Sequence, residues 1–148
     1  MVLVIILVLA LDQLSKYLVS SQLSLYQSVP LIPPVFSLTL VHNRGAAFGI
    51  LKGHLWLLIA VTLGAIMLLA ATLRQRRLRE KMRLTTWALC LILSGAAGNL
   101  IDRLLHGYVI DFFDFHVWPV FNIADSAISV GAVLLAWSLF RGRDTQRS

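Results

Sequence analysis

Four long runs of apolar residues dominate the sequence, and shorter, more polar segments separate them. The runs cover about residues 2–19, 54–73, 84–104 and 121–140. Each approaches the roughly 20 residues that a helix needs to cross the hydrocarbon core of a membrane. The runs are continuously apolar rather than alternating, and a segment in lipid must satisfy its own backbone groups. The pattern therefore predicts four transmembrane helices.

Two of the intervening segments have the character of β-structure. The stretch "FSLTLVHN" alternates apolar and polar residues in places, and "YVIDFFDF", after Gly107, is rich in β-branched and aromatic residues. We expect short strands from the first and an extended segment from the second. The predicted fold class is an all-α membrane protein with four transmembrane helices and a small extracytoplasmic region, β-rich or irregular, at the outer membrane surface. All of it forms one domain, residues 1–148.

Composition and charge agree with a membrane protein and give it an orientation. Of the 148 residues, 58% are hydrophobic and 14% charged, more apolar than a soluble domain of this length. Nine of the 13 Lys and Arg residues lie in segments 74–83 and 141–148, which should be cytoplasmic together with both termini. Segments 20–53 and 105–120 should then be extracytoplasmic. The net charge of +6 indicates membrane lipid as a partner, and nothing indicates nucleic acid.

The first apolar run contains two ionisable residues, Asp12 and Lys16. An ionisable side chain inside a span costs at least about 2.5 kcal/mol, so such a residue suggests a function. Asp12 and Lys16 are four residues apart and share a helix face, which permits an ion pair. The pair could be part of the scaffold or could position a substrate. Cys90, the only cysteine, cannot form an internal disulfide and is predicted to be a packing residue.

Polar residues also gather at the outer end of the third run. Asn99 shares a helix face with Asp102 and Arg103, and Arg103 could neutralise a nearby acid. We expect Asp102 to form a structural ion pair with Arg103. Asp111 follows on the extended segment, at a depth where non-helical backbone is tolerated only inside protein or beside a water-filled cavity.

The fourth run begins with a second candidate carboxylate. Asn122 is a plausible helix cap, and Asp125 would lie in the first turn, where the helix dipole favours its ionised form. Two carboxylates brought together cannot both ionise easily, so Asp111 and Asp125 could share a proton and activate a water molecule. Upstream, "NRGAAFG" is either a tight turn capped by Asn43 or one wall of a peptide groove, with Asn43 and Arg44 as polar contacts.

Four ordered segments carry a resemblance to a known family. They are "DQLSK" at 12–16, "NRGAAFG" at 43–49, "GNLIDRLLHGYVIDF" at 98–112 and "FNIADS" at 121–126. They resemble bacterial lipoprotein signal peptidase (signal peptidase II) and include that family's signature G-N-x-x-D-R-x-x-x-G-x-V-x-D-F without a break. The resemblance extends over essentially the whole chain.

The resemblance implies an activity and a set of site residues. It implies an aspartic endopeptidase of the bacterial cytoplasmic (inner) membrane that cuts prolipoproteins just before a diacylglyceryl-modified cysteine. The active site would lie near the outer face, with no metal or organic cofactor, and we expect a monomer. Asp111 and Asp125 would be the catalytic pair. The supporting or substrate-binding residues would be Asn43, Asn99, Arg103, Asn122, Asp12 and Lys16.

Two other functions remain open from the residues alone. Internal acids and bases could form a proton relay in a small transporter, although here the acids cluster toward one membrane face. A metal-dependent hydrolase could use His42, His54, His106 or His116, although none has a recognised ligand spacing. Asp114 is expected to face water. Ser126 has no histidine near it in sequence and is expected to cap backbone rather than act as a nucleophile.

Overall fold

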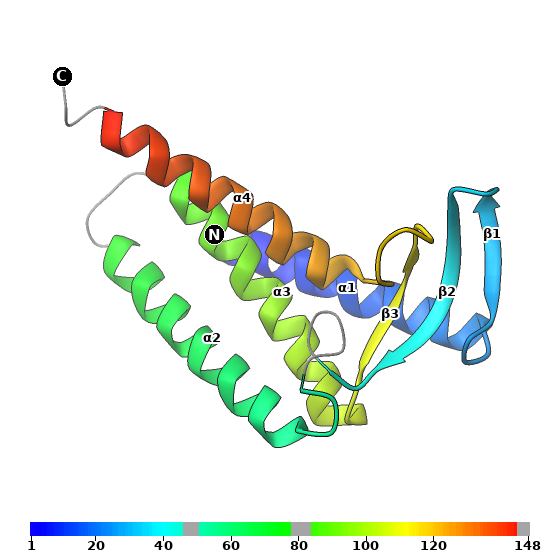
Figure 1. Ribbon diagram of the computed structural model, residues 1–148. Coiled ribbons are helices and arrows are strands. Elements are labelled where there is room, and N and C mark those ends of the chain that lie inside the picture. Colours follow the sequence, from blue (N-terminus) through cyan, green and yellow to red (C-terminus); the bar gives the residue numbers. More distant parts are fainter. Residues whose placement is uncertain (46–50, 78–83, 145–148) are drawn as a thin grey trace.

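The computed structural model describes residues 1–45, 51–77 and 84–144 as four long helices and three strands. In chain order these are α1 (Val2–Gln22), β1 (Ser28–Ile32), β2 (Phe36–Asn43), α2 (Leu55–Arg77), α3 (Leu84–His106), β3 (Val109–Asp114) and α4 (Ile123–Asp144). The helices form a bundle, and the sheet projects from one end of it (Figure 1). The predicted fold class is confirmed.

Helix α3 is the centre of the bundle. It packs against α1, α2 and α4, and it also contacts β3. All four helices are long and apolar enough to cross a membrane, but 56% of the α3 span is buried, against 11%, 11% and 17% for α1, α2 and α4. The outer helices expose large apolar side chains such as Leu3, Met67 and Val133. Such exposure is expected where lipid is the solvent.

Helices α3 and α4 approach each other closely at two glycines. A Cβ atom on Gly95 would collide with the carbonyl oxygen of Ala124 in α4, and one on Gly131 would lie 2.7 Å from the carbonyl oxygen of Ala88 in α3. Small residues at helix contacts in membranes allow this approach. The close contact matters for function because it fixes the start of α4 against α3.

A small apolar core closes the opposite end of the bundle from the sheet. It contains the buried side chains of Leu73, Leu89 and Cys90, with Met1 and Leu135 packed against them. The predicted packing role of Cys90 is confirmed. This cluster also places the start of α1 beside the end of α2 and the start of α3, so the polar residues near the other ends of these helices meet beside the sheet.

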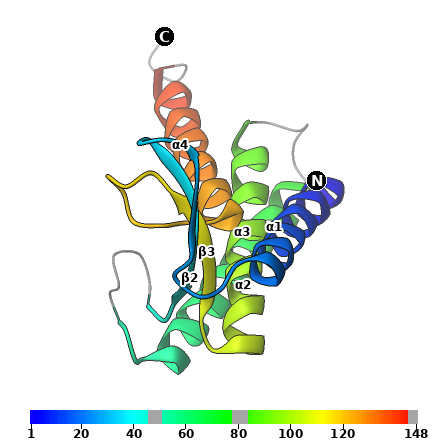
Figure 2. The same ribbon diagram turned by 90° about the vertical axis from the view of Figure 1, so that its right-hand side faces the viewer.

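The sheet is antiparallel, with strand order β1-β2-β3. The pairing of β2 with β3 is irregular between Leu38 and Val41, and it is regular again where Val41 pairs with Asp111. Strand β3 lies next to the bundle, whereas β1 is the outer edge (Figure 1). In the view turned by 90°, the sheet lies in front of the helices (Figure 2). The sequence predicted β2 and β3, but it did not reveal β1, all of whose residues are exposed and therefore lack a buried face.

The helix bounds differ from the predicted spans by a few residues. Helix α1 continues to Gln22 and α2 to Arg77, whereas α4 begins at Ile123 instead of residue 121. The later start of α4 has a local cause, because Asn122 caps it. The predicted turn 43–49 and the basic link 74–83 lie partly outside the described residues, and so does the tail 141–148. The membrane sidedness of each segment remains a prediction.

The contact between α3 and α4 predicts different effects of the same substitution at two helical glycines. Gly95→Ala should destabilise the protein by about 1–3 kcal/mol, because the added methyl group overpacks the contact with Ala124. Gly64→Ala in α2, whose Cβ would meet nothing within 4 Å, should change stability by no more than about 1 kcal/mol. Thermal unfolding in detergent measures both, and equal melting temperatures would contradict the packing argument.

Candidate functional site

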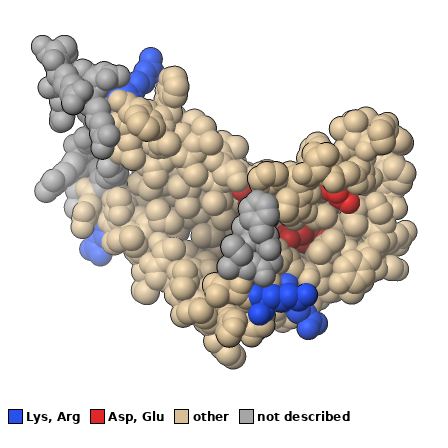
Figure 3. Space-filling model, in the orientation of Figure 1, with Lys and Arg blue, Asp and Glu red and all other residues tan. Residues whose placement is uncertain are grey.

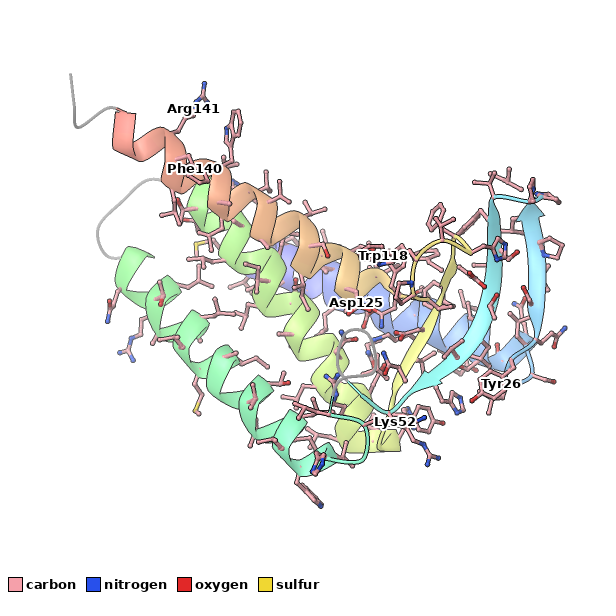
Figure 4. The ribbon with its side chains drawn as sticks, viewed as in Figure 1. Tyr26, Lys52, Trp118, Asp125, Phe140 and Arg141 are labelled. Carbon is pink, nitrogen blue, oxygen red and sulfur yellow. The ribbon has the colours of Figure 1, made fainter. Side chains whose placement is uncertain are left out.

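One cavity contains both candidate carboxylates. Its volume is about 480 Å³, and it lies between α2, α3, α4, β3 and the segment that joins β3 to α4. Asp111 reaches it from β3 and Asp125 from the first turn of α4. Figure 4 places Asp125 at the start of α4 with Trp118 nearby, far from Phe140 and Arg141 at the other end of that helix.

The cavity has a polar end and an apolar part. The polar end is lined by Asn43, Asn99, Arg103, Asp111 and Asp125. The apolar part lies between the helices and is lined by Val61, Ala65, Leu69, Ile92, Ala96 and Ile128. On the surface, acidic atoms come into view at the hollow where the bundle meets the sheet (Figure 3). The cavity can therefore hold a polar group and an apolar group of one ligand at the same time.

Asn122 and Asp125 cap the start of α4 reciprocally. The backbone N–H of Asp125 donates to Oδ1 of Asn122 at 2.9 Å, and the backbone N–H of Asn122 donates to Oδ2 of Asp125 at 3.3 Å. The predicted cap is confirmed. Because these bonds satisfy N–H groups that the first turn would otherwise leave unpaired, they also fix the direction of the Asp125 carboxylate.

Asparagine side chains hold the remaining carboxylate oxygens of the pair. Asn122 Nδ2 donates to Oδ1 of Asp111 at 2.7 Å, and Asn43 Nδ2 donates to Oδ2 of Asp111 at 3.0 Å. Asn99 Nδ2 donates to Oδ1 of Asp125 at 2.8 Å. Each of the four carboxylate oxygens therefore accepts one N–H. These donors orient both acids without removing the negative charge from the site.

Asp111 is the more deeply buried acid, with 1% of its surface exposed. Burial raises the pKa of Asp111 from about 3.8 to about 7, and the negative charge of Asp125 acts in the same direction. The N–H donors of Asn43 and Asn122 oppose this rise without cancelling it. At neutral pH the pair can therefore retain a proton on Asp111, so the site can supply both an acid and a base.

Asp12, Lys16 and Asp102 form a buried ionic cluster behind the pair. Lys16 Nζ lies 2.8 Å from Oδ2 of Asp12 and 2.9 Å from Oδ2 of Asp102. The predicted ion pair of Asp12 with Lys16 is confirmed. The predicted pair of Asp102 with Arg103 is wrong, because Asp102 turns toward α1 and meets Lys16. The spacing of residues within α3 could not reveal this partner on another helix.

Arg103 and Arg44 have different surroundings from each other. Arg103 lines the cavity and donates to the carbonyl oxygens of Gly45 at 3.1 Å and Asn99 at 3.5 Å. It therefore braces the chain next to Asn43 while bringing positive charge toward the acids. Arg44 is exposed and is not part of the cavity lining, so of the two polar contacts that the groove interpretation suggested, only Asn43 lies there.

A Ser-His-Asp arrangement occurs on the sheet, away from the cavity. Ser37 Oγ lies 3.1 Å from Nε2 of His116, and Nδ1 of His116 lies 3.4 Å from Oδ1 of Asp114. Ser37 is only 3% exposed, so a substrate cannot reach its hydroxyl. Asp114, which is expected to face water, is partly exposed: its side chain is 16% exposed, and it also accepts a hydrogen bond from Thr39 at 2.7 Å across the sheet.

Local contacts also describe the other residues that the rival interpretations named. Ser126 Oγ donates to the backbone carbonyl oxygen of Asn122 at 3.0 Å, as expected of a hydroxyl near a helix start. Within residues 1–45, 51–77 and 84–144, no three or more His, Cys, Asp or Glu side chains converge as metal ligands would. His42 instead stacks on Tyr108, with ring centroids 3.8 Å apart.

Sequence reasoning missed one neighbour of the ionic cluster, which lies outside the cavity, and one part of the cavity lining. Gln13 donates from Nε2 to both Asp12 and Asp102, at 3.1 and 3.0 Å, and its only sequence signal was its place inside "DQLSK". The loop residues Trp118 and Pro119 line the cavity beside Asp125, and no local pattern separates them from an ordinary turn. All eight site residues named from the sequence belong to the cavity or to the hydrogen-bonded network behind it.

Known proteins resemble this chain over nearly its whole length. A family model described as signal peptidase (SPase) II matches residues 4–141. A lipoprotein signal peptidase of Moorella thermoacetica is 50% identical over 135 residues, covering 90% of this chain and 88% of the relative. That of Geobacter metallireducens is 48% identical over 145 residues, covering 93% and 88%.

Two solved structures are similar to this chain over most of its length. A bacterial membrane enzyme solved by the in meso method at 2.3 Å superposes with a TM-score of 0.89 at 30% identity, covering 97% of this chain and 89% of that one. A second, solved by the same method at 1.9 Å, gives a TM-score of 0.79 at 33% identity, with 93% and 90% covered. The match of the family model over nearly the whole chain, together with these relatives, shows that this chain belongs to the signal peptidase II family.

Proposed function

We propose that this protein is a membrane aspartic endopeptidase that removes the signal peptides of bacterial prolipoproteins. It cuts just before a diacylglyceryl-modified cysteine, and Asp111 and Asp125 activate the attacking water. The observation that carries this proposal is a single cavity lined by both carboxylates, in which amide N–H groups hold every carboxylate oxygen. Family membership supports the substrate class.

The two acids have complementary roles in the reaction. The ionised carboxylate of Asp125 takes a proton from water, while the protonated Asp111 donates its proton to the scissile carbonyl oxygen. The resulting tetrahedral carbon then loses the nitrogen of the modified cysteine, which leaves with a proton returned by Asp125. One of the two hydroxyl groups on that carbon returns a proton to Asp111 and becomes the new carbonyl group. The products are a signal peptide with a new carboxyl terminus and a lipoprotein with a free cysteine amine. No covalent acyl-enzyme forms.

The shape of the cavity suits a substrate that is both peptide and lipid. Its polar end lies where the helices meet the sheet, and its apolar part continues between α2, α3 and α4. A peptide bond can meet the acids at the polar end while the acyl chains stay in lipid or along the apolar wall. The Asn43 and Arg103 side chains would contact the peptide near its scissile bond. Peptide and lipid are thus recognised in one place.

We also propose the location of the enzyme. It spans the bacterial inner membrane four times as a monomer, with both termini cytoplasmic and the acids near the outer face. Support comes from the basic residues of segments 74–83 and 141–148, since Lys and Arg near span ends are retained in the cytoplasm. The packing of Met1 beside Leu73 and Leu89 is consistent with a shared cytoplasmic side for the amino terminus and the basic link.

If Asp111 and Asp125 act together as a catalytic dyad, Asp111→Asn and Asp125→Asn should each lower the cleavage rate by more than about 1,000-fold. Loss of one residue of such a unit removes most of the activity of the whole unit. The matched control is Asp114→Asn, which removes a carboxylate that hydrogen-bonds across the sheet to Thr39 and should keep most activity. A gel-mobility assay on lipid-modified prolipoprotein in detergent measures all three. If either dyad variant stayed active and the control variant lost its activity, the assignment of the chemistry to Asp111 and Asp125 would be wrong.

The raised pKa of Asp111 predicts a fall in activity on the alkaline side. Asp111 holds its proton up to a pH of about 7 and loses it above that value, so the general acid disappears as pH rises. The value of kcat/KM for the free enzyme should fall about tenfold per pH unit above this point. Initial rates from pH 5 to 9 test it, and a rate that keeps rising through pH 8 would show that no such acid is required.

Two substitutions separate the aspartic mechanism from a serine mechanism. Ser37→Ala and Ser126→Ala should each retain most of the cleavage rate, because neither hydroxyl lies among the cavity-lining residues. Cleavage should also continue in a metal chelator, since the two carboxylates supply both the acid and the base of the proposed reaction. The same gel assay reports each result. An inactive but folded Ser37→Ala variant would favour the serine arrangement.

A further inference from the structure

The ammonium group of Lys16 has three hydrogens, and three oxygens receive them. The acceptors are Oδ2 of Asp12 at 2.8 Å, Oδ2 of Asp102 at 2.9 Å and Oδ1 of Asn99 at 3.1 Å. Lys16 is 2% exposed, so water does not compete for these hydrogens. A lysine ammonium is a donor in every direction. All three of its bonds therefore end inside the protein.

Two of these acceptors hold the backbone next to the dyad. The other oxygen of Asp12, Oδ1, accepts the backbone N–H of Ala124 at 2.9 Å, one residue before Asp125. Oδ2 of Asp102 accepts the backbone N–H of Ile110 at 3.1 Å, one residue before Asp111. Lys16 thus joins, through one carboxylate each, the backbone of α4 and the backbone of β3.

The third bond of Lys16 fixes the amide orientation of Asn99. Because the ammonium can only donate, the Asn99 atom that faces it must be the oxygen, and Nδ2 then points to Asp125. A second obligatory donor, the backbone N–H of Asp125, fixes Asn122 in the same way, with its Nδ2 toward Asp111. Asn122 Nδ2 also donates to Oδ1 of Asn99 at 3.1 Å, so the two amides support each other.

We propose that Lys16 is the positioning residue that sets the separation and the hydrogen bonding of Asp111 and Asp125. Through its three partners, the Lys16 ammonium holds the backbone of α4, the backbone of β3 and the carboxylate of Asp125. A change at Lys16 therefore moves the two acids relative to each other. This inference rests on the proposed function, because it matters only if the two acids act together. Lys16 itself does not line the cavity that contains the acids.

Folding alone gives a weak reason for such a cluster. Charges removed from water lose solvation, and well-packed neutral groups of similar volume often serve stability equally well or better. Beside a reaction centre, the buried cluster of Asp12, Lys16 and Asp102 can instead hold the reacting groups in place. A charged centre with three short contacts allows little displacement of its partners, and an error of about 1 Å in reacting groups can cost about 100-fold in rate.

A neutral replacement of the whole cluster separates positioning from folding. The variant Asp12→Asn/Lys16→Met/Asp102→Asn leaves no unpaired buried charge and retains side-chain oxygens for the N–H groups of Ala124 and Ile110. The matched control is Gln13→Met, which removes hydrogen bonds to Asp12 and Asp102 but leaves all three bonds of Lys16 in place. The assays are thermal unfolding in detergent, kcat and KM on lipid-modified prolipoprotein, and the pH dependence of kcat/KM.

The positioning role predicts a specific combination of results. The neutral triple variant should fold, keep the KM of the wild type and lose about 100-fold in kcat. The two limbs of its pH profile should also move, because the variant removes the charge of Lys16, which acts on Asp111, and because the interaction between the acids depends on their separation. Gln13→Met should lose some thermal stability and keep most of its kcat with an unchanged pH profile.

Each alternative result has a definite meaning. A triple variant that does not fold, or one whose kcat falls no further than that of Gln13→Met, would make the cluster purely structural and overturn the inference. Wild-type protein and the Asp111→Asn variant are measured in the same assays as controls. Failure of folded wild-type protein to cut the substrate would contradict the proposed function itself, whereas normal cutting by the triple variant with an inactive Asp111→Asn would contradict only the role of Lys16.

Discussion

The cost of placing carboxylates in a dry environment governs this structure. A buried acid is tolerated only where hydrogen bonds replace its lost hydration, and here each oxygen of Asp111 and Asp125 accepts one N–H. Within the described residues no buried side-chain nitrogen or oxygen lacks a partner. The donors come from strand β2, from helix α3 and from the start of helix α4. The elements must therefore meet at one point, and that requirement explains the sheet at the end of the bundle.

The same constraint links packing to chemistry. Gly95 lets α4 touch α3, and Gly98 leaves room for the Asp12 carboxylate, since a Cβ there would lie 2.5 Å from its Oδ2. These contacts bring the first turn of α4 to Asn99. Burial that is costly for folding would serve the proposed catalysis, because it keeps a proton on Asp111 near neutral pH. Stability and acid–base chemistry are thus determined by the same few contacts.

Much of the fold follows from local sequence patterns. The parts that could not be predicted depend on partners that are distant in the sequence. Long apolar runs, the cap at Asn122 and the spacing of Asp12 and Lys16 are local signals, and each was confirmed. The partner of Asp102 was mistaken because Lys16 lies on another helix. Asp114 and Ser37 meet only through the register of β2 with β3, which no periodicity specifies. Strand β1 escaped detection because it has no buried face.

In the proposed reaction the two acids hydrolyse one particular peptide bond in a lipid-modified substrate. The decisive measurement is mass spectrometry of both products, after reaction of purified protein in detergent with lipid-modified and unmodified prolipoprotein in a metal chelator. We expect one cut, only in the modified substrate, with the diacylglyceryl-cysteine as the new amino terminus and one water added across the bond. A cut elsewhere, equal cutting of the unmodified protein, or no cut by folded protein would contradict it.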